Sequence, residues 1–120
     1  MPDTLSPRIT FHGLLPSPSL EAQIRAEVED LATSGHAISG CRVSVELPHR
    51  HRRRGGLYRV VIELDVRGIH VVVGRSADQE VMHANARLAV RDAFRAVARQ
   101  LEDHRRRHGE TIRARAPSAV

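Results

Sequence analysis

Residues 57–73 read LYRVVIELDVRGIHVVV and contain the clearest secondary-structure pattern of the chain. Apolar side chains at every second position from Tyr58 to Val66 would share one face of a long strand. Arg67-Gly68 then marks a tight turn, and alternate apolar positions continue from Ile69 to Val73. This stretch therefore predicts an antiparallel hairpin.

Two further strands and a helix precede the hairpin. Residues Arg8–His12 and Cys41–Leu47 both alternate polar and apolar side chains, which is typical of half-buried strands. Between them, the Ser17 hydroxyl can cap a helix whose first position suits Pro18, and Gly35 favours a stop near residue 34. The apolar stripe of this helix comprises Leu20, Ile24, Val28 and Leu31.

A second helix follows the hairpin. Asn85 is a good cap residue, so we expect this helix to run from about Asn85 to His108 and to end at Gly109. Residues 76–84 are expected to be a loop, although residues 76–79 also fit a capping box that would start the helix earlier. The apolar stripe comprises Val90, Phe94, Val97 and Leu101.

The resulting element order is β-α-β-β-β-α, which predicts an α+β fold. Two helices are expected to pack on one face of a four-stranded sheet that is mixed or antiparallel. The length of 120 residues suits one domain, here residues 8–108, with flexible ends at 1–7 and 109–120.

The composition is that of an ordinary globular protein, with 41% apolar and 28% charged residues, but its charge is unusual. All 19 basic residues are arginine, and the net charge is +5. Aromatic residues make only 2% of the chain, which argues against a stacking platform for unpaired bases. A basic chain of this kind is better suited to binding phosphate backbones by charge and shape.

Several other classes of protein are disfavoured. The single cysteine, Cys41, can form neither an internal disulfide nor a thiolate zinc cage, and its place on an apolar strand face suggests a buried thiol. The start lacks a signal peptide and no apolar run could span a bilayer, so we expect an intracellular, cytoplasmic protein without membrane partners. The histidine pairs 49/51 and 104/108 lie among arginines, so no metal is expected, and we find no catalytic centre or cofactor motif.

Two basic clusters are the candidate binding residues. Four arginines of the second helix recur every four residues, and three more follow at its end: Arg87, Arg91, Arg95, Arg99, Arg105, Arg106 and Arg107. Like charges at this spacing repel one another, which favours a binding ridge over a merely solvated face. The second cluster is the loop after Pro48, with Arg50, Arg52, Arg53 and Arg54, and Arg75 is a weaker addition.

Particular segments resemble the ribosome hibernation-promoting factors, also called ribosome-associated inhibitors or sigma modulation proteins. They are residues 57–64 (LYRVVIEL), 66–68 (VRG), 71–75 (VVVGR), 89–94 (AVRDAF) and 98–103 (ARQLED). The similarity covers roughly residues 8 to 110 and is to the short form of the family. It implies a domain similar in plan to double-stranded-RNA-binding folds.

The resemblance also implies a function. Such factors occupy the channel between head and body of the small ribosomal subunit where mRNA and tRNA would lie, and they stop translation. Their basic helix residues contact ribosomal RNA, at positions that match Arg91, Arg95, Arg99, Arg105 and Arg106 here. The first helix differs from relatives because four acidic residues stand against Arg25.

The leading hypothesis is therefore a ribosome-binding translation inhibitor without chemistry of its own, present as a monomer or weak homodimer and needing no small-molecule substrate. Two alternatives remain open: a regulator that binds an acidic protein such as a transcription (sigma) factor, and a general double-stranded-RNA-binding module.

Overall fold

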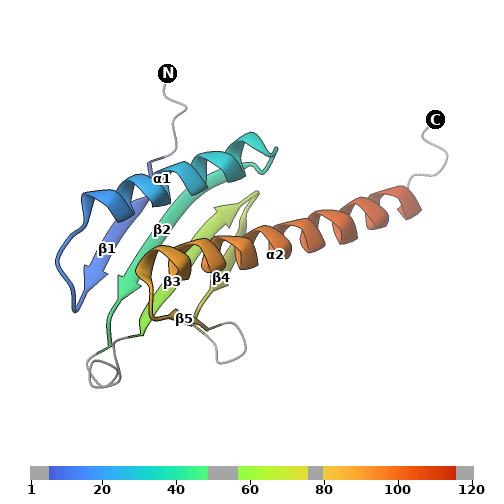
Figure 1. Ribbon diagram of the computed structural model, residues 1–120. Coiled ribbons are helices and arrows are strands. Elements are labelled where there is room, and N and C mark those ends of the chain that lie inside the picture. The colour runs from blue at the N-terminus through green and yellow to red at the C-terminus, as the bar shows by residue number, and fades with distance from the viewer. Residues whose placement is uncertain (1–5, 49–56, 76–79, 116–120) are drawn as a thin grey trace.

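A computed structural model describes residues 6–48, 57–75 and 80–115, and for residues 108–115 it describes the backbone only. The predicted central hairpin is present. Arg67 and Gly68 form its turn, both with positive φ (52° and 81°), as a tight two-residue hairpin turn requires. The elements in chain order are β1 (Arg8–His12), α1 (Pro18–Thr33), β2 (Ile38–Glu46), β3 (Tyr58–Val66), β4 (Ile69–Val73), β5 (Val81–His83) and α2 (Ala86–Arg115) (Figure 1).

The strands form one mixed sheet in the order β1-β2-β3-β4, and β5 pairs with β3. β1 is parallel to β2, and the other pairings are antiparallel. β4 and β5 share β3 because they pair with different parts of it, residues 62–66 and 58–60. At Gly74, where the chain leaves β4, a Cβ atom would lie 2.2 Å from the Val60 carbonyl oxygen, so only glycine fits.

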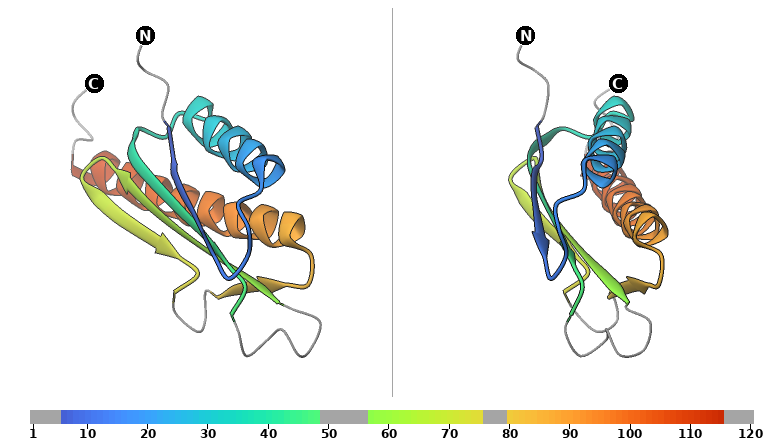
Figure 2. Two further views of the ribbon diagram at one scale, coloured as in Figure 1. Left: turned by 90° about the vertical axis from the view of Figure 1, so that its left-hand side faces the viewer. Right: turned by 60° about the vertical axis from the view of Figure 1, so that its left-hand side comes forward.

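Both helices cover the same face of the sheet and run side by side, while the opposite face is open (Figure 2). The core lies between the two layers, and the expected stripes of both helices are buried in it. α2 adds Ala89 and Ala93 to its stripe, and alternate residues of β2 and β3 close the core from the sheet side. The predicted α+β fold, with two helices on one face, is confirmed.

The structure corrects two expectations about the C-terminal part. Residues 81–83, expected to lie in a loop, form β5, so the sheet has five strands rather than four. α2 does not end at Gly109 but continues to Arg115. Interior glycine costs a helix only about 1 kcal/mol, and no proline occurs until Pro117, so nothing stops the helix earlier.

The remaining boundaries lie close to those expected. α1 begins after Ser17, whose hydroxyl oxygen accepts from the Leu20 amide (3.2 Å), and it ends at Thr33. α2 begins after Asn85, and the earlier start is wrong because residues 81–83 are a strand. β2 begins at Ile38, three residues before the expected start.

Candidate nucleic-acid interface

The predicted binding arginines of α2 lie on a helix whose N-terminus is capped by Asn85. The Asn85 side-chain oxygen accepts hydrogen bonds from the amides of Arg87 (2.9 Å) and Leu88 (3.2 Å). The opposite side of the helix is fixed by its buried stripe, in which Val90 and Val97 are fully covered. A helix so anchored presents its outer side chains in a fixed order.

The described arginines of this row are all exposed, but they do not all do the same thing. Arg87 braces α1, because its Nη1 donates to the Ser19 hydroxyl (2.9 Å) while Gln23 donates to the Arg87 carbonyl (2.9 Å). Arg105 braces the other end of α1, because its Nη2 donates to the Ser34 carbonyl (3.1 Å). These contacts also show that the two helices run parallel.

Arg105 reaches a small polar cluster at the end of α1. Its Nη2 lies 3.1 Å from His36 Nδ1, and Nη1 pairs with the Glu102 carboxylate at 3.3 Å. The His36 side chain is only 6% exposed, and burial, followed by the charge of Arg105, lowers the pKa of this imidazole. A neutral imidazole can accept from Arg105, so the guanidinium is committed to the fold. α1 has no basic residue in its own last turn, and Arg105 supplies the missing cation.

Three arginines in the middle of the row remain available. Arg91, Arg95 and Arg99 are exposed, and within the described residues none makes a hydrogen bond or an ion pair of 4 Å or less. Each lies about 6 Å farther along the helix axis than the one before. We call these three residues the free arginine row. Guanidinium groups so spaced can bind several oxygens of an extended polyanion at once.

One carboxylate faces the free arginine row. Burial and the neighbouring Asp30 raise the pKa of Glu27 on α1, while Arg91 and Arg95 act in the opposite direction. Spacing along the chain does not predict that Glu27 lies near these arginines, since this depends on which side of α1 meets α2.

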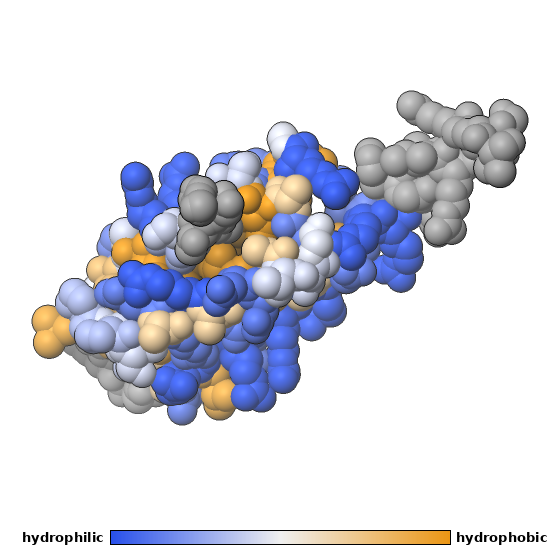
Figure 3. Space-filling model, turned by 90° about the horizontal axis from the view of Figure 1, so that it is seen from above, coloured by the Kyte–Doolittle hydropathy of each residue, from blue (hydrophilic) through white to orange (hydrophobic). Residues whose placement is uncertain are grey.

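Of the other predicted basic residues, the structure describes Arg75, Arg106 and Arg107. Arg75 lies on the open face of the sheet, where its Nη2 pairs with Glu63 at 2.7 Å. Arg106 pairs with Asp103 of its own helix, and Arg107 is exposed at the same end. This projecting part of α2 is hydrophilic (Figure 3). The loop residues Arg50, Arg52, Arg53 and Arg54 lie outside the described part of the chain.

The single cysteine, Cys41, is buried on β2. Burial raises the pKa of the Cys41 thiol to about 12, so this side chain would be a poor nucleophile. No group of three or more histidine, cysteine or carboxylate side chains that could hold a metal occurs among these residues. No helix in the described ranges is long and apolar enough to cross a membrane.

Comparisons with known proteins show the family of this chain and its fold. Residues 8–109 match the family model described as Sigma 54 modulation protein / S30EA ribosomal protein. A ribosomal subunit interface protein from Coxiella burnetii superposes with a TM-score of 0.65 at 12% identity, covering 82% of this chain and 96% of that one. The Protein Y N-terminal domain from Thermus thermophilus gives 0.60 at 12% identity, covering 84% and 98%. No curated protein matches the sequence significantly.

Proposed function

The chain belongs to the Sigma 54 modulation protein / S30EA ribosomal protein family, and on that premise we propose that it is a ribosome-associated hibernation factor. It would act in the cytoplasm by occupying the mRNA and tRNA channel of the small subunit, and so stop translation without chemistry of its own. The observation that carries this proposal is the free arginine row, whose three guanidinium groups have no partner within 4 Å among the described residues.

Phosphate binding explains why such a row would persist. Like charges four residues apart on a helix destabilise it by a few tenths of a kcal/mol per pair. Phosphates of folded ribosomal RNA would remove that repulsion and accept charge-assisted hydrogen bonds. Loss of the condensed counterions would add to the affinity and make it depend steeply on salt.

The proposal is tested by sedimenting the tagged protein from stationary-phase cells through a sucrose gradient. We expect it in the fractions of small subunits or whole ribosomes, and to leave them as salt is raised. Finding it only in the top, soluble fractions would contradict a ribosomal role.

A second candidate is a regulator that binds an acidic protein, because the free arginine row would also suit a row of carboxylates. Salt separates the two candidates. Each phosphate contact contributes a slope of roughly −0.7 to −0.9 in log affinity against log salt, whereas an acidic protein releases no condensed counterions. Binding to any RNA duplex with the affinity shown for small subunits would instead favour a general double-stranded-RNA module.

A further inference from the structure

Two exposed arginines, Arg8 and Arg42, lie on the open face of the sheet, away from α2. At one end of this face is a shallow hollow of about 310 Å³ lined by side chains from β1 to β4. Arg8 and Arg42 lie on one side of it, and Glu63, Asp65 and His70 lie on the other. The helices cover the opposite face of the sheet, so a ligand here could not contact the free arginine row (Figure 2).

Arg8 and Arg42 are register partners on the neighbouring strands β1 and β2. Both point away from the core, because Ile9 and Val43 beside them pack into it. Neighbouring strands are about 4.8 Å apart, and like charges directly opposite one another destabilise a sheet. Both side chains are exposed, and neither makes a hydrogen bond or ion pair with another described residue.

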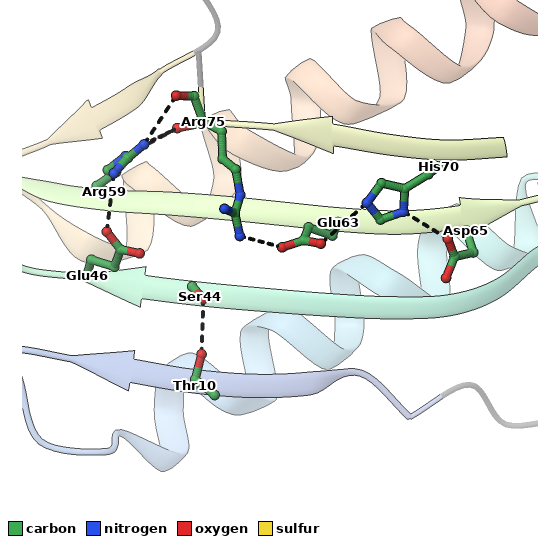
Figure 4. Close-up of polar contacts among 9 residues, drawn as sticks. Thr10, Ser44, Glu46, Arg59, Glu63, Asp65, His70 and Arg75 are labelled. Atoms are coloured by element: carbon green, nitrogen blue, oxygen red, sulfur yellow. Dashed lines mark hydrogen bonds and ion pairs between the residues drawn. The ribbon is translucent and has the colours of Figure 1, made fainter. Parts of the chain in front are cut away.

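The carboxylate that could neutralise this pair is used elsewhere. Glu63 is the register partner of Arg42 on β3, but its side chain pairs with Arg75 (2.7 Å) and His70 (3.4 Å) (Figure 4). Asp65 is occupied by the other nitrogen of His70, at 2.9 Å. Both acids of the hollow thus already contact other side chains, Glu63 with Arg75 and His70 and Asp65 with His70, and the two arginines have no such partner in the described chain.

The backbone at this end also leaves room for a ligand. The pairing of β2 with β3 is irregular between Ile38 and Gly40. A Cβ atom at Gly40 would lie 3.0 Å from an Asp65 carboxylate oxygen, so a side chain there would press on the wall of the hollow. Glycine at this position keeps the hollow open.

We propose that Arg8 and Arg42 form a second phosphate-binding site, on the opposite face of the sheet from α2, that takes a backbone phosphate of RNA. One guanidinium group suffices for a carboxylate, whereas two on adjacent strands match an anion with more acceptor oxygens. The RNA as source of the phosphate rests on the function proposed above. The domain would then contact RNA through both of its faces, as an object inside a channel does.

The site itself is tested with inorganic phosphate and the full chain. We expect the Nε–Hε NMR signals of Arg8 and Arg42 to shift saturably in the titration, and the Arg8 shift to be lost in R42Q. Arg25, already paired with Glu21 on α1 at 3.3 Å, is the internal control. Signals of Arg8 and Arg42 that move no more than that of Arg25 would overturn the proposal.

The RNA source is tested with purified small subunits. The R8Q/R42Q variant is expected to reduce the salt slope of binding by about 0.7 to 0.9, the contribution of one phosphate contact. The matched control R25Q/R67Q removes two exposed arginines elsewhere and should retain the wild-type slope. Equal slopes for both double variants would exclude RNA as the source. If the wild type does not bind subunits, the proposed function fails, and the phosphate titration still decides whether the site exists.

Discussion

The two helices bury similar apolar stripes against one face of the sheet but differ in the charge they present to solvent. α1 carries four carboxylates and one arginine, whereas α2 as far as residue 107 carries seven arginines and three carboxylates. Packing therefore demands only the stripes, and the outer surfaces are open to other requirements. The difference supports the proposal that the positive charge of α2 serves binding, since α1 folds onto the same sheet without it.

Both helices contribute to the same apolar core, and substitutions in this core should have the largest effect on stability. Phe94→Ala in α2 and Ile24→Ala in α1 each remove a buried side chain, at 2% and 0% exposure. We expect losses of about 3–5 and about 2–5 kcal/mol in the free energy of unfolding, respectively. Urea denaturation measures both. A loss below about 1 kcal/mol at either site would show that this helix is not part of the core.

The next test removes a brace between the helices. Arg105→Ala leaves the Ser34 carbonyl and His36 without their donor, and we expect a loss of about 1 kcal/mol in the free energy of unfolding. Arg106→Ala is the matched control, because Arg106 pairs only with Asp103 of its own helix among the described residues. Equal unfolding midpoints for the two variants would mean that Arg105 does not join the helices.

The charge contrast can be sharpened at Glu27, the acid of α1 that faces the free arginine row. Glu27→Gln should raise the affinity for small subunits about 1.4- to fivefold, in line with about 0.2–1 kcal/mol for an exposed charge interaction. The Glu27 pKa is higher in the folded protein than in the unfolded chain, so the ionised carboxylate opposes folding at any pH above the unfolded pKa. Glu27→Gln should therefore lose no stability at pH 7.

The control for this variant is Glu29→Gln, which removes a carboxylate from the exposed side of the same helix. Binding assays at fixed salt should find Glu29→Gln close to wild type. If both variants gain affinity equally, only the net charge of α1 matters, and the facing arrangement of Glu27 does not.

The smallest expected effect is a pH dependence at the end of α1. The His36 pKa is lowered in the folded state, so below the ordinary value of 6.5 the unfolded chain binds the proton more readily. Stability should therefore fall as pH drops through 6.5 and level off below the folded pKa. His36→Asn keeps an acceptor for Arg105 and should flatten this part of the profile, measured by urea denaturation from pH 7.5 to 5. If the pH dependence of stability is the same in His36→Asn as in the wild type, His36 is not the group responsible for it.

Periodicity predicted most of the fold, because the long elements bury continuous stripes. The two-residue alternation from Tyr58 to Val66 and the stripe from Val90 to Leu101 both correspond to observed elements. β5 has only three residues, too few to show an alternation. The predicted end of α2 at Gly109 is wrong because a single glycine does not stop a helix when helix-forming residues follow it.

The sequence predicts that the arginines of α2 recur along one side of the helix, but it does not predict which of them contact α1. By spacing, Arg87 and Arg91 are equivalent, yet one bonds Ser19 and the other has no partner within 4 Å in the described chain. Arg105 likewise bonds Ser34 and His36 at the end of α1, whereas Arg106 pairs with Asp103 of its own helix. These roles follow from the parallel arrangement of α1 and α2, which sequence spacing does not contain.

The most direct test of the central claim is co-sedimentation of purified small subunits with the variant R91E/R95E/R99E. Wild type should pellet with the subunits at low salt, and the control R25E/R67E should do the same. The triple variant should remain in the supernatant while its circular dichroism and melting temperature show an intact fold. A folded triple variant that pellets as fully as wild type would contradict the free arginine row as the binding surface.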